Sequence, residues 1–166
     1  MSFPVPPWDE AQIRAYFTRA DLAPGYSQML GFEFVDVSVD DMRFECRFNP
    51  GKELCSPWGA IQGGFVTAML DDTMSLAAIS TVGFDGVVPT LEMKTSFFAP
   101  VMPGPLRAVG QVLRRGKKTF FTEGRLFAAD GSVTTHATAT CIHRPHDRVK
   151  QDRARQARGE SSRSTE

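Results

Sequence analysis

The sequence predicts an α+β domain in which an antiparallel sheet packs against one long buried helix. Three observations point to this fold class. Residues 63–82 are apolar on nearly every side of a helix, which is typical of a helix that other elements enclose. Two segments of alternating apolar and polar residues precede this helix, and four follow it. The chain has 166 residues, 42% of them hydrophobic, which suits one globular domain with a substantial core.

Residues 1–26 are expected to form an extension that precedes the main domain. The first residues are rich in proline, and apolar side chains at helical spacing predict a short helix over residues 8–20. The Pro24-Gly25 pair then ends this helix.

Six strands are expected from the alternation of apolar and polar residues. In one of them, Phe44, Cys46 and Phe48 alternate with charged residues, as in a half-buried strand. The Asp130-Gly131 pair between the last two runs is a strong hairpin signal. The expected strands are residues 32–39, 42–48, 87–98, 106–113, 119–128 and 133–142.

The C-terminal residues 146–166 contain almost no apolar side chains. Such a segment cannot bury enough surface to offset the entropy of ordering it, so we expect a polar, disordered tail. Its excess of basic residues could bind a polyanion, but a solvated tail is the preferred interpretation. Residues 27–145 remain as the main domain.

The composition excludes several classes of function. Lys and Arg number 19, as do Asp and Glu, so the formal net charge is zero and dedicated nucleic-acid binding is not expected. The first residues do not resemble a signal peptide, and no run is long and apolar enough to span a membrane. The scattered Cys46, Cys55 and Cys141 suggest neither disulfides nor a metal site. A cytoplasmic protein is therefore expected.

Two adjacent carboxylates, Asp71 and Asp72, interrupt the apolar helix. An ionised carboxylate in apolar surroundings is costly unless it has a partner, so each needs a structural or chemical reason. Adjacent helix positions point about 100° apart, and only one of the two can face a given site. Asp72 is interpreted as facing solvent or a subunit interface, or as pairing, whereas Asp71 is the catalytic candidate.

The helix begins with Gly63 and Gly64, which would let a ligand approach the backbone closely. The first amides and the dipole of a helix stabilise developing negative charge, although glycines here can also serve turn geometry alone. Asp71 lies seven residues after Gly64, on nearly the same face but about 10.5 Å along the axis. If both serve one reaction, the carboxylate must come from a second copy of the chain. The spacing therefore suggests an active site shared across a dimer.

The run Gln62-Gly63-Gly64 followed by Leu70-Asp71 resembles the HGG(x)6D signature of hotdog-fold acyl-CoA thioesterases, in particular the PaaI-like, phenylacetate-pathway group. The sequence TLEMKTSFFAP at residues 90–100 is similar to the long strand that follows the helix in that family. The resemblance covers about residues 27–144. It implies a hotdog fold, with the antiparallel sheet wrapped around the long helix.

The resemblance also implies roles for individual residues. In the family, the first motif glycine donates its amide to the thioester oxygen, and the aspartate is the nucleophile or the general base. These roles fall on Gly63 and Asp71, and Thr90 is the hydroxyl residue that helps to position the aspartate or the water. Gln62 stands where the family has histidine, and it can form hydrogen bonds but cannot titrate.

The resemblance further suggests how the substrate is held. Ser56 stands where the family often has asparagine, six residues before the motif, and Gly64 follows the oxyanion glycine. The cations at residues 114–118 could be a solvated hairpin tip, but the resemblance favours contact with the phosphates of coenzyme A. These cations are Arg114, Arg115, Lys117 and Lys118.

The expected activity is hydrolysis of an acyl-CoA thioester by a homodimer that pairs again into a tetramer. No metal or redox cofactor is expected, because the thiolate of coenzyme A is a good leaving group. One alternative is a hotdog protein that binds acyl-CoA without hydrolysing it, which the changes at Gln62 and Ser56 would mark. A hydratase or dehydratase is less favoured, because the sequence has no histidine before His136.

Overall fold

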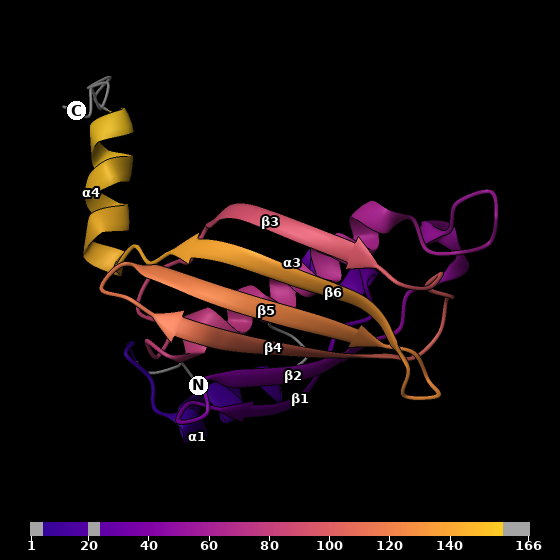
Figure 1. The fold of residues 1–166 in the computed structure, drawn as a ribbon. Coiled ribbons are helices and arrows are strands. Elements are labelled where there is room, and N and C mark those ends of the chain that lie inside the picture. The colour runs from indigo at the N-terminus through magenta and orange to yellow at the C-terminus, as the bar shows by residue number, and fades with distance from the viewer. Residues whose placement is uncertain (1–4, 20–23, 158–166) are drawn as a thin grey trace.

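The computed structural model describes residues 5–19 and 24–157, and side chains as far as residue 151. A six-stranded antiparallel sheet curves around helix α3 (Gly63–Ser80), which lies behind the strands in Figure 1. The strand order is β1-β2-β4-β5-β6-β3. The strands are β1 (Glu33–Ser38), β2 (Arg43–Phe48), β3 (Thr90–Phe97), β4 (Leu106–Arg115), β5 (Thr119–Phe127) and β6 (Val133–Ile142). The predicted α+β hotdog class is confirmed.

Helix α3 is enclosed because its apolar side chains face the concave side of the sheet. Met69, Leu70 and Met74 are fully buried in the core. The helix comes close to the sheet where Gly110 of β4 pairs with Gly124 of β5. A Cβ atom at Gly110 would lie 2.5 Å from the carbonyl oxygen of Thr73, and one at Gly124 would lie 2.9 Å from Met74 Cγ. These two glycines make room for the helix.

The N-terminal segment packs across one end of this core. Helix α1 (Glu10–Phe17) is capped by Asp9, whose carboxylate accepts from the Gln12 amide at 2.8 Å. Arg14 donates to Asp36 of β1 at 2.5 Å, which ties the helix to the edge of the sheet. The short helix α2 (Gly25–Met29) starts at the glycine that was expected only to end a helix.

Two further elements differ from the sequence-based expectation. The long loop before α3 contains a turn of 3₁₀ helix, η2 (Lys52–Leu54). Residues 146–157, for which a disordered tail is expected, form helix α4 (His146–Ala157). This polar helix extends away from the sheet (Figure 1), so local hydrogen bonding, rather than burial of apolar surface, holds it. The last part of the expected tail lies outside the described residues.

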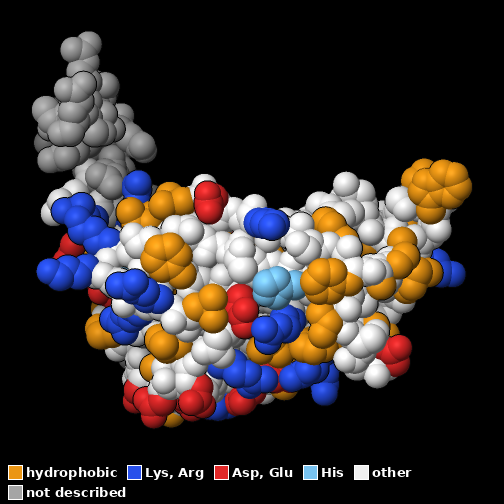
Figure 2. Space-filling view, in the orientation of Figure 1, with side chains coloured by type: hydrophobic (Ala, Val, Ile, Leu, Met, Phe, Trp, Pro, Cys, Tyr) orange, Lys and Arg blue, Asp and Glu red, His pale blue; other side chains and the backbone are white. Residues whose placement is uncertain are grey.

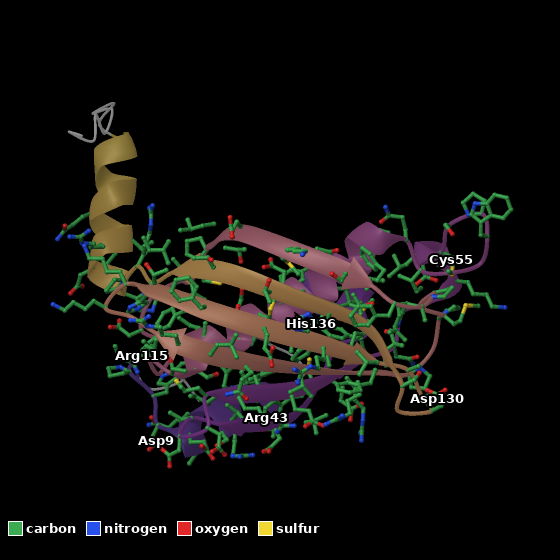
Figure 3. All side chains as sticks on the ribbon, viewed as in Figure 1. Asp9, Arg43, Cys55, Arg115, Asp130 and His136 are labelled. Atoms are coloured by element: carbon green, nitrogen blue, oxygen red, sulfur yellow. The ribbon has the colours of Figure 1, made fainter. Side chains whose placement is uncertain are left out.

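The face of the sheet turned away from α3 carries mixed side chains. Figure 2 shows acidic, basic and hydrophobic groups interspersed over it, without a large area of one charge. Near its middle, Glu123 pairs with Arg125 at 3.0 Å and lies 3.4 Å from His136, which is labelled in Figure 3. In the described part of the chain, no helix is long and apolar enough to cross a membrane.

Candidate active site

The N-terminus of α3 presents one free backbone amide. The side chain of Gln62 caps the helix, its Oε1 accepting from the Gly64 amide at 2.7 Å. Within the described residues, the Gly63 amide has no hydrogen-bond acceptor, as expected for the first residue of a helix. An amide in this position, aligned with the helix dipole, can donate to an oxygen that gains negative charge. Gly63 therefore suits an oxyanion site, whereas the Gly64 amide is already engaged.

A shallow apolar hollow of about 370 Å³ adjoins this helix end. It lies between α3 and the segment that follows β3, and its lining residues include Ile61, Gly63, Val66, Phe97 and Val101. A Cβ atom at Gly63 would be 3.3 Å from Cζ of Phe97. The glycine thus keeps the backbone amide open between the helix and this aromatic ring.

The second part of the site is a carboxylate held by a hydroxyl group. Thr90, the first residue of β3, donates from Oγ1 to Oδ1 of Asp71 at 2.6 Å. The Thr90 hydroxyl in turn lies 3.8 Å from Sγ of Cys141, its partner across the strands. Asp71 and Thr90 are both partly exposed, so a substrate can reach them. The predicted pairing of this aspartate with this threonine is present in the structure.

Asp72 has a different environment from its neighbour. Its Oδ1 accepts from the hydroxyl of Tyr26 in α2 at 2.9 Å. Its Oδ2 is buried, and no donor from the described residues reaches it. Burial raises the pKa of Asp72 to about 6, and the hydrogen bond from Tyr26 only partly offsets this effect. Asp72 is thus partly exposed, but it pairs with a tyrosine of its own chain.

The two halves of the site do not meet in one chain. Gly63 and Asp71 are eight residues apart on α3, about 12 Å along the axis at 1.5 Å per residue. A thioester carbonyl held by the Gly63 amide would be out of reach of the carboxylate eight residues further on.

The remaining predicted binding residues lie at both ends of α3. The backbone of Ser56 accepts from the Gly59 amide at 2.9 Å, so Ser56 shapes the loop before the helix. The basic segment lies at the opposite end, where Arg115 donates to the carbonyl of Thr81 at 2.6 Å. Figure 3 shows Arg115 and Cys55, the residue before Ser56, at opposite ends of the sheet. Along the helix, the distance from Gly63 to Thr81 is about 27 Å.

Residues 114–118, the basic segment, also differ from the hairpin tip that the sequence predicts for them. Strand β4 extends to Arg115, so Arg114 and Arg115 are strand residues, and the connection to β5 is only residues 116–118. Arg114 pairs in the ladder with Phe121 beside a bulge. Arg114, Lys117 and Lys118 are exposed.

Three residues near these groups were not identified from the sequence. Tyr26 contacts Asp72 across 46 positions, Cys141 contacts Thr90 across 51, and Phe97 lies against Gly63. Each contact joins segments distant in the chain, and no local pattern predicts it. Tyr26 was also placed in the extension rather than against the main helix.

Comparison with known proteins supports the assignment of the fold and gives the family. Residues 59–135, which include the Gln62-Gly63-Gly64 run and Asp71, match the thioesterase superfamily. A protein of Saccharolobus solfataricus named as an esterase is 31% identical over 109 residues, which cover 64% of this chain and 77% of that protein.

Two solved structures share the fold. A thioesterase from Ralstonia eutropha, described as related to phenylacetic acid degradation, superposes with a TM-score of 0.69 and 30% identity, covering 72% of this chain and 90% of that one. A Streptococcus mutans protein bound to acetyl-CoA superposes with a TM-score of 0.63 and 17% identity, covering 69% of this chain and 89% of that one. At this identity, the second comparison shows the fold alone.

The sheet wrapped around one long helix, together with these matches, places the chain in the hotdog class of thioester hydrolases. The chain belongs to the thioesterase superfamily, and the predicted likeness to its PaaI-like members is confirmed.

Proposed function

We propose that the protein hydrolyses an acyl-CoA thioester at a site built from two chains. The hydrogen bond from Thr90 to Asp71 carries this proposal, because it fixes a partly exposed carboxylate that forms no ion pair with the described residues. Gly63 of one subunit would bind the thioester oxygen, and Asp71 of the partner subunit would act on the carbonyl carbon. The separation of about 12 Å along α3 is the reason for requiring two chains.

The chemistry follows from the two groups. The Gly63 amide and the dipole of α3 stabilise the oxyanion that forms when the carbonyl is attacked. As a general base, Asp71 takes a proton from water while the water oxygen bonds to the carbonyl carbon. The carbon–sulfur bond then breaks, and the proton passes to the leaving thiolate. As a nucleophile, Asp71 would instead attack the carbonyl carbon and expel the thiolate, leaving a mixed anhydride that water hydrolyses to the free acid and the regenerated carboxylate. Neither route calls for a metal or redox cofactor.

The free edge of the sheet supports assembly into a dimer. In the described residues, β3 pairs only with β6, so its outer edge has no partner strand. Leu91 and Phe97 on this strand are 62% and 52% exposed. An unpaired edge with exposed apolar side chains is a template for another chain. We propose that a second copy joins at β3, with a further pairing of dimers.

The exposed cations near α3's C-terminal end support binding of a nucleotide. Arg114 at the end of β4 and Lys117 and Lys118 in the connection to β5 are exposed cations suited to phosphate. The neighbouring Arg115 contacts Thr81, which is about 27 Å from Gly63 along α3 of the same chain. The S. mutans neighbour holds acetyl-CoA, which is consistent with acyl-CoA as the substrate. The three cysteines are free thiols, in keeping with the proposed cytoplasmic location.

The decisive experiment compares the two carboxylates. Asp71→Asn keeps the shape of the side chain but removes the charge, so we expect kcat for acyl-CoA to fall by about 10²–10⁴-fold. We expect Asp72→Asn to lower kcat by less than about tenfold, because Asp72 is turned to Tyr26 rather than to Thr90. The measurement is kcat of both folded variants on the same acyl-CoA. An inactive Asp72→Asn variant beside an active Asp71→Asn variant would contradict the assignment.

A second candidate function is binding of acyl-CoA without hydrolysis. The replacement of histidine by Gln62 favours it, because Gln62 is used as a helix cap and cannot exchange protons. Tight binding of a panel of acyl-CoA esters, with no release of free thiol from any of them, would establish this function instead.

A further inference from the structure

Behind the pair formed by Thr90 and Asp71 lies a third side chain, the thiol of Cys141. Cys141 of β6 is fully buried and stands opposite Thr90 of β3 in the strand ladder. Its Sγ lies 3.8 Å from Oγ1 of Thr90, and that oxygen lies 2.6 Å from Oδ1 of Asp71. Thiol, hydroxyl and carboxylate thus follow one another from the core to the candidate active site.

The direction of these hydrogen bonds follows from the protons that each group carries. A carboxylate can only accept, so the single proton of the Thr90 hydroxyl is used on Asp71. The Thr90 oxygen can then form a second hydrogen bond only as an acceptor. Burial raises the pKa of Cys141, which keeps its thiol protonated and able to donate at neutral pH. The thiol is therefore the donor to Thr90.

Thr90 lies where the sheet of the single chain holds it weakly. It is the first residue of β3, an edge strand, and the ladder to β6 is irregular between Thr90 and Glu92. Among the described residues, Thr90 is also the only one that donates to the side chain of Asp71. The orientation of the carboxylate thus depends on one hydroxyl at the end of an edge strand.

We propose that Cys141 is a positioning residue, whose thiol donates to Thr90 and so holds the Thr90 hydroxyl on Asp71. A donor to a hydroxyl oxygen polarises the O–H bond, which strengthens its donation to the carboxylate. Cys141 itself does not touch the substrate, because it is buried behind Thr90. The role in the reaction rests on the proposed function, but the hydrogen bond can be tested without turnover.

The first test is spectroscopic and uses the S–H stretching vibration, whose frequency falls when a thiol donates a hydrogen bond. The band of Cys141 is the one that disappears in Cys141→Ala. We expect it to move to higher frequency in Thr90→Val. Thr122 of β5 is a competing acceptor, because it also lies beside the thiol and its own proton goes to the carbonyl of Ala139 at 3.2 Å. Thr122→Val should shift the band less, and a band that stays in place in Thr90→Val would overturn the proposal.

The second test is kinetic. Cys141→Ala should lower kcat for acyl-CoA by about two- to tenfold with KM nearly unchanged, because the lost hydrogen bond orients the carboxylate rather than binding substrate. Cys141→Ser keeps a donor and should restore much of kcat. The matched control is Cys46→Ala, which loses the same atoms from an equally buried position. Cys46 lies 3.3 Å from Oγ1 of Thr73, but that hydroxyl donates to the carbonyl of Met69, so kcat should stay as in the wild type.

The outcomes separate this inference from the proposed function. An equal loss of kcat in Cys141→Ala and Cys46→Ala would show that the thiol acts through packing alone, and it would overturn the positioning role. A wild-type protein that releases no coenzyme A from acyl-CoA would refute the proposed function. The S–H band would still decide, in that case, whether Cys141 holds Thr90.

Discussion

Asp71 and Asp72 are neighbours in the sequence, but α3 directs their carboxylates to different partners. Asp71 accepts from Thr90 at the start of β3, and Asp72 accepts from Tyr26 in α2. The helical rotation of about 100° per residue turns the two carboxylates toward different elements, and only Asp72 has an oxygen that is buried without a donor among the described residues. Burial raises the pKa of Asp72 to about 6.

At the residue scale, the pKa of Asp72 predicts a pH-dependent cost to stability. Its folded pKa of about 6 lies above the ordinary value of 3.8, so the folded state disfavours the charged form. The contribution of Asp72 to the free energy of unfolding is therefore largest below about pH 4, where the carboxyl group is protonated. This contribution is lost as the pH rises through 6. At pH 8, the Asp72→Asn variant should therefore be more stable than the wild type, with a free energy of unfolding about 1–3 kcal/mol higher.

The check is chemical denaturation of both proteins across this pH range. The two curves should converge near pH 3.5, where the wild-type carboxyl is protonated and resembles the amide. A constant difference at all pH values would mean that Asn acts through packing rather than through the lost charge.

At the scale of elements, the closeness of α3 to the sheet depends on the paired glycines of β4 and β5. Gly110→Ala would place a Cβ atom 2.5 Å from the backbone oxygen of Thr73, where neither strand nor helix has a flexible atom to move aside. We expect a loss of about 1–3 kcal/mol in the free energy of unfolding. Gly25→Ala, where nothing lies within 4 Å, is the control and should be neutral or slightly stabilising.

The β4–β5 connection is the element expected to recognise the nucleotide. Replacing Arg114, Lys117 and Lys118 together by Gln should raise KM for acyl-CoA several-fold, because each exposed cation contributes up to about 1 kcal/mol to binding a phosphate. Short thioesters without the nucleotide should be hydrolysed as before. An equal rise in KM for both kinds of thioester would show that these cations do not bind the nucleotide and that their replacement disturbs the structure instead.

Arg115 is left out of that variant for a structural reason. Its guanidinium donates to the carbonyl of Thr81 at the end of α3, so its loss would also disturb the helix terminus. All four cations of this segment are exposed, but Arg115 alone is set aside here because it also holds the end of α3.

At the scale of the whole molecule, the 12 Å between Gly63 and Asp71 makes activity depend on assembly. Gly63→Pro would remove the oxyanion amide, and Asp71→Asn would remove the carboxylate. After unfolding and refolding as a mixture, the two inactive variants should form hybrid dimers with one intact site. The expected recovery is about a quarter of wild-type activity, because half of the chains enter hybrids and each hybrid has one site of two.

This prediction has two controls. Each variant refolded alone should stay inactive, and the wild type should elute as a dimer or larger in light scattering. A fully active wild-type monomer would disprove the shared site.

Much of the fold could be predicted from the sequence, because its signals are local. Alternation of apolar and polar residues located all six strands, and the start of α3 at Gly63 coincides with the prediction. The helix α2 and the helix α4 were missed. The first is five residues long, and the second has too few apolar residues for periodicity to reveal it.

The sequence by itself determined the long buried helix and the glycine pair at its start, and it singled out Asp71 as the candidate carboxylate, since spacing along one helix decides which residues share a face. Only the tertiary structure decided what those groups touch. It placed Tyr26 on Asp72 and the basic segment at the far end from Gly63, and it gave the geometry of the contact between Thr90 and Asp71 that the family resemblance had implied. These contacts join residues 19, 46 and 34 positions apart, and chain folding rather than local propensity brings such residues together.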